Sequence, residues 1–166
     1  MSRLASSPQA DSKPTGVVPP RWLAPLALLL AVAGIADATY LTIAHYTTPV
    51  LLSCPDTGVI NCAKVTTSSY SSILGVPLAV LGLVFFVGML PFQLPAAWRS
   101  ANPWVRRLRL LGAISGVLMV FWLIYVELYK LNAICLYCSA AHVLTVALFI
   151  VVALGTALTT ETPPLH

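Results

Sequence analysis

Charge is the scarcest feature of this 166-residue chain, because only 8% of its residues are Asp, Glu, Lys or Arg. A soluble domain has about 25% charged residues. Hydrophobic residues make up 58% of the chain, and the mean hydropathy is +0.89. This balance excludes an ordinary water-soluble globule, a disordered chain and a nucleic-acid-binding domain. The chain also lacks a haem, flavin or nucleotide fingerprint, and its apolar runs lack the alternation of a barrel strand.

What the chain has instead is four apolar runs, each long enough to cross a bilayer as a helix. The runs cover residues 22–46, 73–94, 108–129 and 135–158. We therefore predict an all-α membrane protein, with a four-transmembrane-helix bundle over residues 21–158 and a large outer loop over residues 47–72. Residues 1–20, rich in Ser, Pro and Ala, are predicted to be a disordered cytoplasmic tail, and residues 159–166 a second cytoplasmic tail.

The distribution of basic residues predicts the orientation of the bundle. Short loops rich in Lys and Arg stay in the cytoplasm. Residues 95–109 hold four arginines and no acid, and the N-terminal tail is also basic. Both termini are thus predicted inside, with the outer loop and the turn 130–134 outside. A cleaved signal peptide is the alternative for the first run, with Arg21 as its charge, Leu23–Ile35 as its core and Ala36-Asp37-Ala38 as its cleavage site.

All four cysteines fall on the predicted outer side, where disulfides form and persist. Cys54 and Cys62 lie in the outer loop, whereas Cys135 and Cys138 open the fourth run. A Cys-X-X-Cys sequence at the start of a helix favours a thiolate and is typical of redox-active sites. Two dithiols on one face predict a relay by thiol–disulfide exchange. A lipid-soluble quinone in the apolar bundle is the natural final electron acceptor.

The cysteines alone leave two other interpretations open. In the first, two disulfides only staple the outer loop, without catalysis. Alternatively, the cysteines bind a metal ion, although one spacing is C-x7-C and neither His45 nor His142 completes a familiar zinc pattern. We expect no metal.

Several short motifs follow one another in a fixed order along the chain. They are Ser53-Cys54, Cys62, Ser68, Gly75-Val76-Pro77-Leu78-Ala79, Gly82 and Cys135-Leu136-Tyr137-Cys138. In this order they resemble the vitamin K epoxide reductase family in its bacterial form, over roughly residues 22–158.

The resemblance implies a quinone-dependent thiol–disulfide oxidoreductase in a bacterial plasma (inner) membrane, which supports disulfide bond formation with menaquinone or ubiquinone as acceptor. No thioredoxin-like domain follows residue 158, so the expected thiol partner is a separate extracytoplasmic thioredoxin-fold protein. Reduction of vitamin K epoxide by the same site is an alternative, and a disulfide-stapled subunit or a metal-handling membrane protein are the others.

The resemblance also implies roles for individual residues. Cys54 and Cys62 correspond to the loop shuttle pair, and Cys135 and Cys138 to the active-site pair, with Cys138 facing the quinone. Two pocket residues complete the set: Ser68 corresponds to a polar residue above the pocket, and His142 stands where vertebrate enzymes carry a tyrosine.

Three further charged residues lie within or near the apolar runs. Asp37 lies nine residues before Tyr46, about 13 Å deep in the first run. An ionisable residue at that depth is a functional candidate, and a buried acid bonded to a neighbouring helix is the alternative. We predict that Asp37 contributes to quinone binding and that Asp37, His142 or water supplies protons. Glu127 and Lys130 are interpreted as interface anchors.

Overall fold

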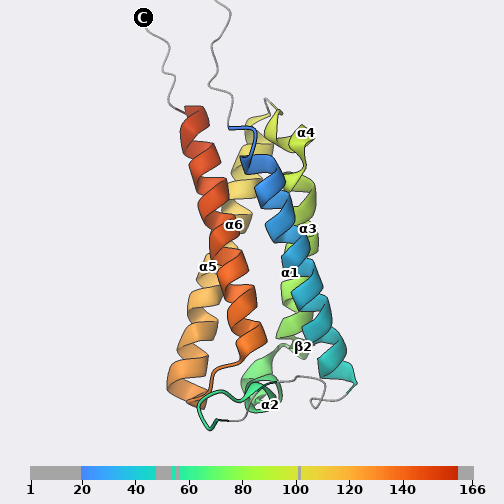
Figure 1. The fold of residues 1–166 in the computed structure, drawn as a ribbon, viewed down its shortest axis with the longest axis vertical. Coiled ribbons are helices and arrows are strands. Elements are labelled where there is room, and N and C mark those ends of the chain that lie inside the picture. Colours follow the sequence, from blue (N-terminus) through green and yellow to red (C-terminus); the bar gives the residue numbers. More distant parts are fainter. Residues whose placement is uncertain (1–19, 48–53, 55–56, 101, 161–166) are drawn as a thin grey trace, which may run out of the picture.

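The computed structural model describes residues 20–47, 54, 57–100 and 102–160. Four long helices pack side by side in this part of the chain (Figure 1): α1 (Leu23–Tyr46), α3 (Leu78–Gln93), α5 (Pro103–Tyr125) and α6 (Leu136–Thr160). A π-helical segment, η3 (Val126–Leu131), prolongs α5. The predicted tails fall almost wholly outside the described residues, as does most of the first half of the outer loop.

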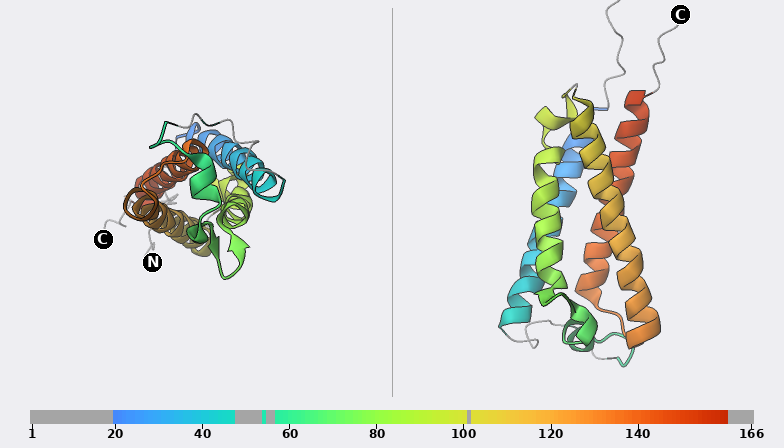
Figure 2. Two further views of the ribbon diagram at one scale, coloured as in Figure 1. Left: turned by 90° about the horizontal axis from the view of Figure 1, so that it is seen from below. Right: turned by 180° about the vertical axis from the view of Figure 1, so that it is seen from behind.

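Short elements cover the two ends of the bundle. At one end lie α2 (Cys62–Thr66), η2 (Ser69–Ser71) and the two strands β1 (Ser72–Ile73) and β2 (Val76–Pro77). The view onto this end shows α2 lying across the bundle (Figure 2, left). The helix α4 (Pro95–Trp98) lies at the opposite end (Figure 1).

Three helices in the described residues are long and apolar enough to cross a membrane. They cover Leu23–Tyr46, Pro103–Leu131 and Leu136–Leu158. The chain is therefore built as an all-α membrane protein. The first of these helices packs against α3 and α6 as part of the bundle, which is what a membrane span predicts for it.

The predicted run 73–94 is shorter as a helix than the sequence indicated. Its helix, α3, begins only at Leu78 and has 16 residues, about 24 Å. The six residues before it, Ser72–Pro77, form a hairpin in which Ser72 pairs with Pro77 and Ile73 with Val76. Leu74 and Gly75 turn the hairpin with φ of 52° and 81°. These left-handed conformations cannot continue a right-handed helix.

The arginines of the predicted cytoplasmic stretch gather at the α4 end, away from α2 (Figure 1). Arg106, Arg107 and Arg109 belong to the first turns of α5 rather than to a loop. The helix starts at Pro103 because the Asn102 side chain accepts a hydrogen bond from the Trp104 N–H, 2.9 Å away. Arg109 is buried, with its guanidinium carbon 3.9 Å from the Trp98 ring centre.

A close helix contact in the core joins α1 to α3 at Gly34. A Cβ atom built on Gly34 would overlap the Phe86 ring. We expect Gly34→Ala to destabilise the fold by about 1–3 kcal/mol, as overpacking does. Gly88→Ala in α3 is the matched control, since nothing lies within 4 Å of its added Cβ. Thermal unfolding in detergent should separate the two variants, and equal midpoints would contradict this packing.

Candidate functional site

The described part of the outer loop is attached to the start of α6 by backbone hydrogen bonds. The Asn61 N–H donates to the Ile134 carbonyl at 3.1 Å, and the Ile134 N–H donates to the Val59 carbonyl at 2.8 Å. The next residue along each segment is a cysteine, Cys62 and Cys135. The bridge therefore brings one cysteine of each pair to the same place.

Cys54 and Cys62 form a disulfide, with their Cα atoms 6.0 Å apart. This separation is within the usual range for a disulfide. Cys62 is the first residue of α2, whose N-cap residue Asn61 accepts a hydrogen bond from the Lys64 N–H at 2.8 Å. Cys62 is 1% exposed, whereas Cys54 is only partly buried. Cys54 is thus the more accessible residue of this disulfide.

Cys135 and Cys138 are free thiols at the start of α6. Together with the loop disulfide they belong to one apolar cluster, whose buried members include Leu41, Ala44 and Val65. Cys135 is 0% exposed. The structure therefore brings the two predicted pairs together in one water-poor environment.

The hydrogen bonds around Cys135 favour its thiolate. Cys135 lies in the connection between η3 and α6, and its Sγ accepts the N–H of Cys138 at 3.3 Å. The Cys138 thiol also hydrogen-bonds to it, and this bond is the main cause that lowers the pKa of Cys135. A thiol with a lowered pKa leaves a disulfide more readily.

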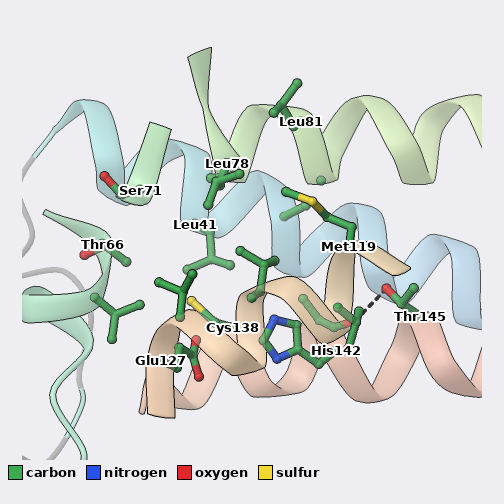
Figure 3. A pocket seen from close by; sticks show the side chains of 18 of the residues that line it. Leu41, Thr66, Ser71, Leu78, Leu81, Met119, Glu127, Cys138, His142 and Thr145 are labelled. Atoms are coloured by element: carbon green, nitrogen blue, oxygen red, sulfur yellow. Dashed lines mark hydrogen bonds between the residues drawn. The ribbon is translucent and has the colours of Figure 1, made fainter. Parts of the chain in front are cut away.

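A cavity of about 300 Å³ opens beside Cys138, between the helices and the outer-loop segment. Figure 3 shows Cys138, His142 and Thr145 of α6 along one side of it, with Leu78 and Leu81 of α3 across from them. Cys138 lines this cavity, whereas Cys135 is not among its lining residues. The two cysteines of the pair are thus divided between the cavity and the loop disulfide.

Two of the three predicted quinone contacts line the same cavity. His142 is buried one turn after Cys138. Ser68 lines the cavity from the loop side, and its hydroxyl donates a hydrogen bond to the Val65 carbonyl at 2.9 Å. Asp37 is not among the lining residues. Its Oδ2 is buried and has no hydrogen-bond partner within the part of the chain that the structure describes.

Comparison with models of protein families extends this picture beyond the cysteines. The model of the vitamin K epoxide reductase family matches residues 25–153. The chain belongs to this family. The match covers all four cysteines, the hairpin before α3 and the residues that line the cavity.

Membership of the vitamin K epoxide reductase family makes the chain a membrane oxidoreductase that acts on thiols and quinones. The disulfide between Cys54 and Cys62 engages two of the four thiols that a metal site would need. Within the described ranges, no group of three or more His, Cys, Asp or Glu residues is placed to hold a metal ion.

The interpretation of Glu127 from the sequence was wrong for this member of the vitamin K epoxide reductase family. Glu127 is not an interface anchor, because it is 6% exposed and lines the cavity. Its carboxylate lies within hydrogen-bonding reach of the Cys135 backbone N–H. A signal was available, since Glu127 follows the buried Val120 by seven residues and Ala113 by fourteen, on one helix face. Lys130 is exposed, as an interface residue should be.

Proposed function

We propose that this chain passes electrons from a reduced thioredoxin-fold extracytoplasmic protein, through its two cysteine pairs, to menaquinone or ubiquinone in the membrane. The reaction supports disulfide bond formation in the partner's substrates. One observation carries most of the proposal. Cys138 lines an apolar cavity, while Cys135 and the Cys54–Cys62 disulfide pack together beside it.

The proposed setting is a bacterial plasma membrane, with both termini cytoplasmic and the cysteines on the outer face. In this arrangement α3 is the fourth span, packed against α1 and α5. The distribution of charge supports the orientation, because the arginines gather at the end of the bundle opposite α2 and the cysteines (Figure 1).

The proposed relay consists of thiol–disulfide exchanges, so each new S–S bond replaces an old one. A partner thiolate attacks Cys54, and the Cys54–Cys62 bond breaks to release the Cys62 thiolate. Cys62 then attacks Cys135 of the oxidised Cys135–Cys138 pair and releases Cys138. The second partner thiol frees Cys54, which reforms the bond with Cys62 and leaves Cys135 reduced.

The cavity suits a quinone head group as the electron-accepting substrate. A quinone ring is planar and apolar, and its two carbonyl oxygens accept hydrogen bonds. The lining is predominantly apolar and includes the Phe85 ring and the Met119 side chain. His142 offers a donor to the carbonyl oxygens, and Ser68 offers one when its hydroxyl turns away from the Val65 carbonyl. Few polar groups on an apolar wall are typical of small-molecule sites.

The direct test is anaerobic quinone reduction by the purified protein, with a reduced thioredoxin-fold protein as electron donor. We expect one quinol for each disulfide formed in the donor. Reduction of vitamin K epoxide but not of quinone would favour the alternative substrate. The absence of both reactions would indicate a stapled membrane subunit without catalysis.

We predict that His142→Ala weakens quinone use without slowing the thiol exchanges. Loss of one hydrogen bond costs about 1 kcal/mol, so the apparent KM for quinone should rise about fivefold. Val143→Ala is the matched control, because Val143 is the next residue of α6 and is 68% exposed. Steady-state kinetics give the KM, and single-turnover oxidation of the partner gives the exchange rate. An unchanged KM would remove His142 from the binding site.

A further inference from the structure

Glu127 lies where the two free thiols and the cavity meet. It belongs to η3, and both Glu127 and Cys138 line the cavity at the end nearer to Thr66 and Ser71 (Figure 3). Its carboxylate is in reach of the Cys135 backbone N–H and acts electrostatically on both thiols. The turn of η3 is held by the Ala133 N–H, which donates to the Glu127 carbonyl at 3.1 Å.

Burying a carboxylate in this position costs free energy, so its presence here indicates a functional role. Ionisable residues within membrane spans are rare and by default mark functional sites. Glu127 is buried, and no ion pair joins it to a lysine or arginine among the residues that the structure describes. Lys130, on the same π-helical segment, is exposed. π-helical turns occur frequently at functional sites.

The quinone half-reaction has a requirement that the four cysteines do not meet. Oxidation of Cys135 and Cys138 breaks two S–H bonds and forms one S–S bond. Two electrons and two protons leave the thiols, and quinol formation takes up two of each. Protons must therefore reach the quinone oxygens inside an apolar cavity, either from the Cys138 thiol or from solvent.

We propose that Glu127 is the proton-transfer group of the Cys135–Cys138 pair, an inference that rests on the proposed function. The Glu127 carboxylate accepts the Cys138 thiol proton as the sulfur is oxidised. It then donates that proton to one quinone oxygen and returns to the carboxylate form. The Cys135 proton is released to solvent, and the second quinone oxygen takes up one proton from solvent.

The test compares three variants of the full-length protein in single-turnover experiments. Glu127→Gln keeps an acceptor for the Cys135 N–H but cannot exchange a proton, and Glu127→Ala leaves space for a small acid. Lys130→Gln is the matched control, because it removes an exposed charge from the same segment. A positioned acid or base contributes about 10²–10⁴-fold to a rate. Quinone reduction by the reduced Glu127→Gln protein should therefore slow by at least about a hundredfold.

The remaining measurements separate proton transfer from structural support. Oxidation of the thiol partner by the quinone-free protein should stay at the wild-type rate in Lys130→Gln, and in the two Glu127 variants it should change far less than quinone reduction does. Added formate should speed quinone reduction by Glu127→Ala and leave Glu127→Gln unchanged. A fully active Glu127→Gln, or equal losses in both half-reactions without formate rescue, would overturn the inference alone. A wild-type protein that reduces no quinone would overturn the proposed function and this inference with it.

Discussion

Changing Cys138 to Ser should trap a disulfide between Cys62 and Cys135. Without Cys138, Cys135 cannot close a disulfide with its neighbour. Its thiolate instead attacks Cys62 of the Cys54–Cys62 bond and releases the Cys54 thiolate, and no Cys138 thiol is left to resolve the new Cys62–Cys135 bond. A disulfide needs Cα atoms within about 7 Å. The backbone bridge between Ile60 and Ile134, one or two residues before the cysteines, places the two segments side by side. Both cysteines are also buried in one cluster.

Peptide mapping under non-reducing conditions measures this cross-link after exposure to oxidised partner. Cys135→Ser is the matched control, because it leaves Cys138, which lines the cavity, as the remaining free thiol of the pair. We expect no bond between Cys62 and Cys138 in that variant. If Cys138→Ser instead keeps only Cys54–Cys62 and a free Cys135, then Cys62 is not the relay thiol and the loop disulfide is a staple.

The helices were predictable because length and hydropathy alone set the requirement for crossing a bilayer. The first run, 22–46, agrees with α1 within one residue at its start. The second run failed at its first five residues because their side chains are as apolar as those of the helix. Only local backbone chemistry marks the hairpin there: Gly75 at positive φ and Pro77 directly before α3.

The cysteine pairs were predictable from spacing and position, since Cys-X-X-Cys has a defined local geometry. The acidic residues were harder, because depth in a span does not state which way a side chain points. Asp37 precedes the buried Ala38 by one residue, about 100° away around α1, and it does not line the cavity. The place of Glu127 near the helix end favours an interface anchor, although its helical phase matches buried positions.

Removing the outer-loop pair should block oxidation of a folded protein partner while sparing oxidation of a small dithiol. In the outer-loop pair, Cys62 is almost fully buried, so the partly buried Cys54 is the contact for a protein thiol. Cys135 of the second pair is fully buried. In Cys54→Ser with Cys62→Ser, an external thiol must replace one that is tethered beside Cys135. A tethered group acts at about millimolar effective concentration.

The expected size of the effect follows from that concentration. With a folded partner at about micromolar concentration, quinone reduction should fall roughly a thousandfold. With a small dithiol at about millimolar concentration, the rate should stay within about tenfold of the wild type. Both rates are measured as anaerobic quinol formation, and Ser69→Ala at an exposed loop position is the control. A variant that still oxidises the folded partner at the wild-type rate would show that the Cys135–Cys138 pair accepts electrons directly. Loss of activity with both donors, together with a lower thermal unfolding midpoint, would instead assign the disulfide to folding of the loop over the cavity.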